Sequence, residues 1–134
     1  MRKFFVDTWL IIASLDRDDE HHAHARRLGA SFSGIDLVTH DAVLTEVLAF
    51  FSAEGGRARR AAADAVRNIQ QQWRVVPIDR NLFNAGLDRY AARPDKGYSH
   101  VDCMSMVLME SLGIHHVLTN DQHFAQAGFT LVNQ

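Results

Sequence analysis

Four acidic residues stand apart from the other carboxylates of this chain because of their places in the sequence pattern. Asp7 ends a short apolar run, and Asp121 follows a second run of the same kind. Glu46 and Asp102 lie within apolar segments of helical character. Four carboxylates in one cleft would repel one another, and a hard divalent cation would relieve that repulsion. Mg²⁺ and Mn²⁺ prefer such oxygen ligands, so these residue types predict metal-assisted hydrolysis of a phosphodiester.

Each acid also has a structural explanation that the sequence leaves open. Asp7 and Asp121 are suited to cap the helices that follow them, since Asp is a favoured N-cap residue. Ser99 and Asp102 have the spacing of a capping box. Glu46 is compatible with a solvent-facing position at the edge of its helix. Only the combined placement of the four acids favours a shared site.

The elements that must position these acids alternate between strands and helices. Strand patterns are predicted at residues 3–6, 35–39, 73–77, 114–119 and 129–132. Helical patterns are predicted at residues 8–15, 20–30, 42–53, 57–72, 79–92, 99–112 and 121–127, with Thr39 or Asp41 capping the third of them. This order predicts a three-layer α/β/α sandwich with a central, mostly parallel sheet of four to five strands. Ligands of such sheets bind outside the carboxyl ends of the strands, where Asp7 and Asp121 would lie.

Length and composition set the class of protein. The chain has 134 residues and contains no linker-like segment or internal repeat, so we expect a single domain over residues 1–134. One cysteine, Cys103, excludes an intramolecular disulfide framework and favours a reducing compartment. The sequence has neither a secretory signal pattern nor an apolar run of membrane-spanning length, so we expect a cytoplasmic protein. A net charge of −2 gives no overall attraction to nucleic acid.

Four motifs carry a resemblance to a known family: Phe5-Val6-Asp7-Thr8, Thr45-Glu46-Val47-Leu48, the stretch 98–105 and the stretch 118–124. In order and spacing they resemble the PIN-domain nucleases, in particular the VapC-type toxins of bacterial toxin–antitoxin pairs, over nearly the whole chain. The resemblance implies a PIN-like fold and an endoribonuclease that hydrolyses RNA phosphodiester bonds with Mg²⁺ or Mn²⁺ as cofactor. It also implies three partners: the RNA substrate, a small antitoxin that neutralises the toxin, and a second copy in a homodimer.

The same resemblance implies roles for the four acids. Asp7, Glu46, Asp102 and Asp121 correspond to the acidic quartet of the family, which binds metal and catalyses the reaction. Asp7 and Asp102 are the strongest metal-ligand candidates. Glu46 and Asp121 would complete the ligand shell or orient the attacking water.

Three hydroxyl residues flank these acids. Thr8, Ser99 and Thr119 are predicted to orient the carboxylates, because metal-binding carboxylates need hydrogen-bonding partners of their own. His100 is a departure from the resemblance, since leucine often occupies its place in the Ser-x-x-Asp stretch. His100 replaces no acid, so the departure concerns local packing.

Basic residues offer a second prediction. Arg57, Arg60 and Arg67 lie on one helix, and they predict either a solvated helix or a track for RNA phosphates. His123, two residues after Asp121, is predicted to contact a phosphate in the cleft.

Two other functions are compatible with an acidic α/β chain. One is a PIN-domain nuclease of RNA processing or turnover that is not a toxin. The other is a non-catalytic phosphoacceptor receiver module, which also gathers acids at strand ends. Receivers generally need a lysine after a late strand, and the only lysines here are Lys3 and Lys96.

Overall fold

The computed structural model describes residues 2–32 and 34–133. Within these residues strands and helices alternate as the sequence predicts. The elements in order are β1 (Lys3–Val6), α1 (Thr8–Leu15), α2 (His22–Ala30), β2 (Asp36–His40), α3 (Asp41–Phe50), α4 (Gly56–Gln72), β3 (Arg74–Val76), α5 (Arg80–Ala92), α6 (His100–Leu112), β4 (His116–Leu118), α7 (Gln122–Gln126) and β5 (Thr130–Leu131).

The five strands form one all-parallel sheet in the order β3-β2-β1-β4-β5. β1 is the middle strand, and Phe5 lies opposite Val38 of β2 on one side and Val117 of β4 on the other. The chain builds outward from β1 through β2 to β3, crosses back, and builds the other half through β4 to β5. The strand order therefore reverses between β1 and β4. Receiver modules use the order 2-1-3-4-5, so the topology excludes the receiver hypothesis.

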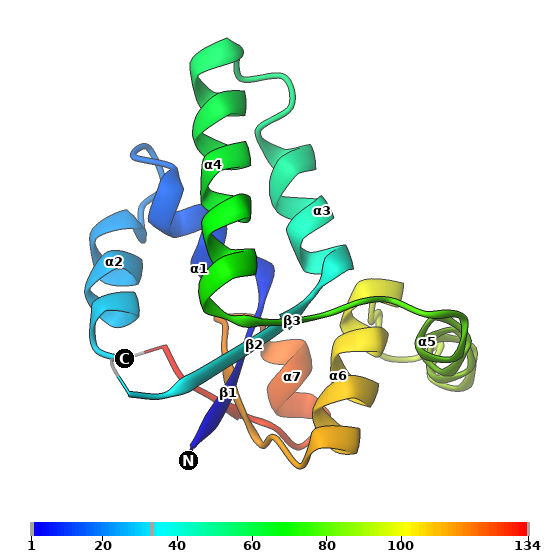
Figure 1. Ribbon diagram of the computed structural model, residues 1–134. Helices are drawn as coiled ribbons and strands as arrows, with labels where there is room; N and C mark the ends of the chain where they lie inside the picture. The colour runs from blue at the N-terminus through cyan, green and yellow to red at the C-terminus, as the bar shows by residue number, and fades with distance from the viewer. Residues whose placement is uncertain (1, 33, 134) are drawn as a thin grey trace.

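Helices cover both faces of the sheet, which confirms the predicted three-layer architecture. Figure 1 shows α1 to α4 on one side of the sheet and α5 to α7 on the other. This separation follows from right-handed crossovers that run in opposite directions in the two halves. Figure 1 also shows α3 and α4 side by side in an arm that extends beyond the sheet.

The core lies where the middle strands meet these helices. Phe5 and Val6 of β1 are fully buried, as are Met106 and Met109 of α6. α5 packs closely against α6 at Gly86, where an added Cβ would lie 2.5 Å from the side chain of Met104.

Several predicted boundaries were wrong. α2 begins at His22 rather than at residue 20, because hydrogen bonds within residues 16–22 form turns there. α3 ends at Phe50 rather than at residue 53. Its N-cap is His40, whose side chain accepts a hydrogen bond from the backbone of Val43, whereas Thr39 or Asp41 was expected.

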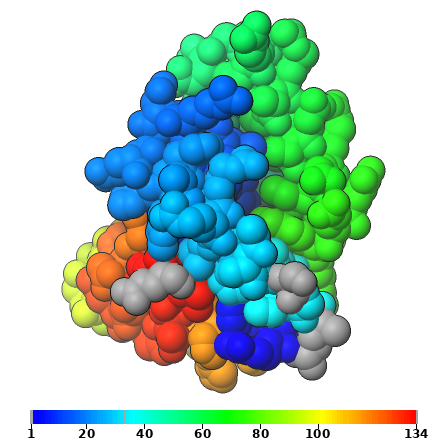
Figure 2. Space-filling view, turned by 90° about the vertical axis from the view of Figure 1, so that its left-hand side faces the viewer, coloured from blue at the N-terminus to red at the C-terminus, as the bar shows by residue number. Residues whose placement is uncertain are grey.

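The C-terminal residues lie against α2. Figure 2 shows this face of the molecule, with the C-terminal segment beside the helix, and the His24 ring contacts the backbone carbonyl of Asn133. Across the described residues no helix is both long and apolar enough to cross a membrane.

Candidate active site

The point at which the strand order reverses places Asp7 next to the end of β4. Asp7 directly follows β1, and Val6 pairs with Leu118, so the chain after β4 begins beside Asp7. Thr119 Oγ1 donates a 2.9 Å hydrogen bond to Asp7 Oδ2. Such reversal points are where open α/β sheets bind ligands.

Asp7 is buried although it is a carboxylic acid, and only 7 % of its surface is exposed. Asp7 occupies the N-cap position of α1, but its side chain makes no capping hydrogen bond, so capping does not account for this acid. Burial raises the pKa of Asp7 to about 7, and the charges of Asp102 and Glu46 act in the same direction. Hydrogen bonds from the Thr8 backbone and from Thr119 partly oppose that rise. These two hydrogen bonds compensate the charge of ionised Asp7 only in part.

Glu46 reaches the same place from α3. Thr8 Oγ1 donates to Glu46 Oε1 at 2.6 Å, as predicted for a residue that orients a carboxylate. Burial is the main cause that raises the pKa of Glu46, and the charge of Asp102 adds to it. The turn from β1 into α1 thus supplies both Asp7 and the hydroxyl that holds Glu46.

Asp102 is both a capping residue and part of the cleft. Its backbone N–H donates to Ser99 Oγ at 3.0 Å, and the Ser99 N–H donates to Asp102 Oδ2 at 3.1 Å. Ser99 therefore orients the carboxylate through its backbone N–H, and support from the Ser99 hydroxyl stays a prediction. Burial raises the pKa of Asp102 most, followed by the charge of Asp121.

Asp121 completes the group as the N-cap of α7. Its Oδ1 accepts a 2.9 Å hydrogen bond from the backbone N–H of His123, and its own N–H donates to Thr119 Oγ1 at 3.1 Å. Thr119 thus links Asp7 and Asp121 through one hydroxyl. The capping and cleft explanations are compatible for Asp102 and Asp121, because a cap uses only part of a carboxylate's accepting capacity.

One cleft of about 680 Å³ is lined by all four predicted acids, together with Thr8, Ser99 and His123. Asp102, Asp121 and His123 each offer a ligand atom within 4.8 Å of the other two. The donor set is mainly carboxylate oxygen, and Asp7, the most buried of these acids, has no cationic partner among residues 2–32 and 34–133. Both features fit a divalent metal ion.

The predicted basic residues divide between two places. His123 lines the acidic cleft, where its ring faces carboxylates. Arg60 and Arg67 line a separate groove between α3 and α4, and Arg67 pairs with Asp64 at 3.3 Å. Arg57 is exposed on α4. Their contact with RNA stays a prediction.

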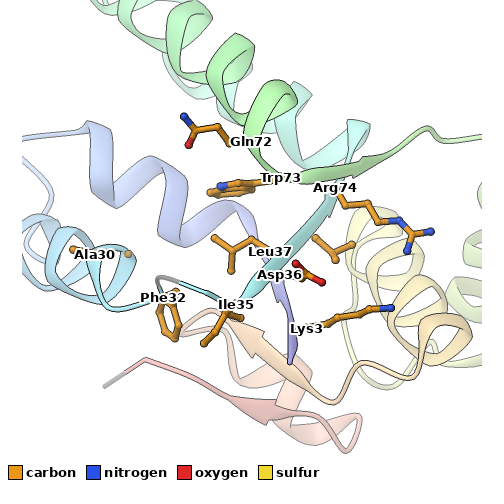
Figure 3. A pocket seen from close by; sticks show the side chains of 11 residues that line it. Lys3, Ala30, Phe32, Ile35, Asp36, Leu37, Gln72, Trp73 and Arg74 are labelled. Carbon is orange, nitrogen blue, oxygen red and sulfur yellow. The ribbon is translucent and has the colours of Figure 1, made fainter. Parts of the chain in front are cut away.

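A second cavity, of about 650 Å³, lies at the amino ends of the strands. Figure 3 shows the charged side chains of Lys3, Asp36 and Arg74 on one side of this cavity and the apolar side chains of Phe32 and Trp73 on the other. Its charges are of both signs, so it lacks the concentrated negative charge of the cleft at the carboxyl ends.

The sequence did not single out His40, the last residue of β2. His40 Nε2 lies 2.8 Å from Ser105 Oγ, and Ser105 Oγ donates to the Val101 carbonyl at 2.9 Å. Because the other ring nitrogen accepts from Val43 N–H, Nε2 carries the proton and donates to Ser105. Burial lowers the pKa of His40 to about 4. This chain of hydrogen bonds fixes β2 to α6 one turn from Asp102.

A parallel sheet that gathers four carboxylates at its reversal point defines the chain as a nuclease-type α/β domain. The model of the PIN domain family matches residues 4–130, and the chain belongs to that family. The chain is 30% identical, over 128 residues that make up 96% of each chain, to a protein of Mycobacterium tuberculosis named 23S rRNA-specific endonuclease VapC20.

Solved structures agree with this assignment. The crystal structure of Mycobacterium tuberculosis VapC20, described as a Sarcin-Ricin loop cleaving toxin, superposes with a TM-score of 0.88 at 31% identity and covers 98% of this chain and 99% of that one. FitAcB from Neisseria gonorrhoeae has a TM-score of 0.71 at 16% identity, covering 97% and 96% of the two chains. DNA-bound VapBC from Salmonella typhimurium has a TM-score of 0.66 at 21% identity, covering 98% of each. The last two likenesses concern the fold.

Proposed function

We propose that this protein is a divalent-metal-dependent endoribonuclease and the toxin of a toxin–antitoxin pair. The observation that carries the proposal is the meeting of Asp7, Glu46, Asp102 and Asp121 in one cleft, with Asp7 buried and making no side-chain capping hydrogen bond. Membership of the PIN domain family and the similarity to VapC20 support the same conclusion.

The donor set favours Mg²⁺ or Mn²⁺ as the cofactor, held by Asp7 and Asp102 with help from Asp121. A bound ion of this kind neutralises charge on the scissile phosphate and activates water for attack. Thr119 holds the Asp7 carboxylate in place, and the Ser99 backbone holds that of Asp102. Both acids are therefore oriented before the ion binds, which is what such ligands require.

Glu46 is the acid best placed to handle the attacking water. Its Oε1 is occupied by the Thr8 hydroxyl, which leaves Oε2 to orient the water and accept its proton. Burial raises the pKa of Glu46, and a raised pKa makes a carboxylate a better base near neutral pH. The four acids thus divide into those that hold the ion and one that orients the nucleophile.

The proposed substrate is ribosomal RNA, because the relative that matches over 96% of its length is named for 23S rRNA. Arg60 and Arg67, in the groove between α3 and α4, are proposed to contact RNA phosphates outside the cleft. The proposed protein partners are a small antitoxin and a second copy of the chain. Phe50, which is 46% exposed and lines the acidic cleft, offers an apolar contact for the antitoxin.

The test begins with metal-depleted protein and two substrates, intact 23S rRNA and a synthetic sarcin–ricin stem–loop. We expect cleavage only after Mg²⁺ or Mn²⁺ is restored, and we expect Asp102→Asn to abolish it. Asp79→Asn is the matched control, since Asp79 also caps a helix by accepting a hydrogen bond but lies outside the cleft. Absence of RNA cleavage at saturating metal would contradict the proposed activity.

The toxin assignment needs a separate experiment in cells. Induced expression of the wild type should arrest growth, expression of Asp102→Asn should not, and co-expression of a small partner encoded beside the gene should relieve the arrest. RNA cleavage in vitro without growth arrest would favour a nuclease of RNA processing instead.

A further inference from the structure

His123 has an unusual position in the acidic cleft. Its Nδ1 atom lies 3.4 Å from Asp102 Oδ2 and 3.3 Å from Asp121 Oδ1. The atom is buried, and among the described residues it has no hydrogen-bond partner with acceptable geometry. One third of the His123 side chain is exposed, and both distances are within ion-pair range for a protonated ring. Either a proton or a cation between Nδ1 and the two carboxylates would therefore satisfy this buried atom.

The spacing of the three atoms suits a shared metal ion. Two ligands about 2.1 Å from one octahedral ion lie about 3 Å apart at adjacent positions. The two distances from Nδ1 are a few tenths of an ångström longer, a difference that small side-chain rotations would close. Each of the three residues offers a ligand atom within 4.8 Å of those of the other two.

The His123 ring is held so that Nδ1 points toward the acids. The buried Tyr98 ring meets it edge to face, with centroids 5.5 Å apart and an interplanar angle of 77°. The backbone N–H of His123 donates to Asp121 Oδ1, which fixes the residue at the start of α7. Gly97 lies beside the opposite nitrogen, Nε2. The orientation is therefore set by neighbours on both sides of the ring.

We propose that His123 Nδ1 binds the divalent ion directly, together with Asp102 and Asp121, and that this nitrogen makes the site prefer Mn²⁺ to Mg²⁺. The inference rests on the proposed metal-dependent function and deepens it. Mg²⁺ favours all-oxygen ligands, whereas imidazole is a good ligand for transition-metal ions, so one nitrogen among carboxylates changes the relative affinities. An alternative is that His123 contacts only the RNA phosphate, and the experiment below separates the two.

The test uses Mn²⁺ bound to the protein without RNA, measured by pulsed electron paramagnetic resonance. Direct coordination by Nδ1 predicts ¹⁴N modulation of the Mn²⁺ signal in the wild type. The modulation should vanish in His123→Phe, which keeps a ring but has no nitrogen, and in His123→Asn, which offers an oxygen ligand. His115→Asn, at an exposed histidine outside the cleft, is the control and should keep the modulation.

Calorimetric titration supplies the second readout. His123→Phe should weaken Mn²⁺ binding about tenfold or more, and it should change Mg²⁺ binding by less than about threefold. Bound Mn²⁺ without ¹⁴N modulation, modulation that persists in His123→Phe, or equal losses for both ions would overturn the inference and leave the proposed nuclease intact. A wild type that binds no divalent ion would overturn the proposed function as well. Circular dichroism checks that each variant folds, and His123→Asn carries the test if His123→Phe does not.

Discussion

Two buried ionisable side chains lie at the ends of neighbouring strands: Asp7 directly after β1 and His40 as the last residue of β2. They differ in how completely the protein supplies their hydrogen-bond partners and neutralises their charge. Both ring nitrogens of His40 have hydrogen-bond partners within the fold, and burial keeps the ring neutral at physiological pH. Asp7 has its main partner in Thr119 and lies near two further acids. Both side chains are buried, but only Asp7 would carry a charge that its surroundings do not neutralise. We infer that His40 serves the fold and Asp7 serves the reaction.

The largest expected effect comes from Asp7→Asn. RNA cleavage should fall about a thousandfold or more, because a metal ligand is lost. The metal-free variant should nevertheless be more stable than the wild type at pH 8. The folded-state pKa of Asp7, about 7, exceeds its ordinary value of 3.8, so the metal-free wild type loses stability as pH rises between those values and has lost it fully at pH 8. Urea denaturation with a chelator measures the difference, and a less stable variant would contradict the comparison.

For His40→Ala we expect the opposite pattern, a loss of stability without a loss of metal affinity. This variant should lose about 3 kcal/mol of unfolding free energy, because it leaves a cavity and removes the partners of Ser105 and Val43. Where it is folded, its affinity for Mn²⁺ should equal that of the wild type. Urea denaturation and calorimetry provide the two readouts, and His115→Ala should change stability by less than about 0.5 kcal/mol. A large loss of metal affinity in the folded variant would give His40 a direct role in the site.

Two buried threonines sharpen the comparison further. Thr119 donates to the Asp7 carboxylate, whereas Thr39 donates to the Val6 backbone carbonyl over the same 2.9 Å. Both are completely buried. Thr39→Val should cost about 1 kcal/mol of stability and Thr119→Val about 2 kcal/mol, because Thr119 Oγ1 also accepts from the Asp121 N–H. Only Thr119→Val should weaken Mn²⁺ binding, by about tenfold. Equal affinities in the two variants would mean that the hydroxyl does not orient Asp7.

The smallest effect is the pH dependence of stability due to His40. Its folded-state pKa, about 4, lies below the ordinary 6.5, so the unfolded chain binds the proton more readily between those values. Stability is therefore complete above pH 6.5 and falls as the pH drops toward 4. About 1 kcal/mol should be lost between pH 7.5 and pH 5.5. The measurement is best made in the Asp7→Asn variant, because ionisation of Asp7 changes stability with pH in the opposite direction. The loss of stability at low pH should be absent when His40→Gln is added to that variant.

Much of the fold could be predicted because each signal was local. The alternation of apolar runs with helical patterns gave the parallel sheet, and the position of Asp7 after a strand located the cleft. The capping box of Ser99 and Asp102 was also visible in the sequence and was confirmed. Local patterns sufficed wherever backbone geometry alone decided the outcome.

What the sequence did not give depends on contacts between distant elements. His40 reaches Ser105 across 65 positions, and no pattern around either residue indicates that pairing. Residues 16–22 form turns because side chains there bind nearby backbone groups, which delays the start of α2. The inward orientation of the His123 ring in α7 depends on the contact with Tyr98, which lies just before α6. Such features follow from packing, which periodicity does not report.

The central claim is that Asp7, Asp102 and the neighbouring acids bind a divalent ion at the carboxyl end of β1. The most direct measurement is anomalous scattering from a crystal of the protein saturated with Mn²⁺. The account predicts a peak about 2.2 Å from carboxylate oxygens of both Asp7 and Asp102, and no such peak in Asp7→Asn. A peak elsewhere in the wild type, or an equal peak at this place in Asp7→Asn, would contradict it.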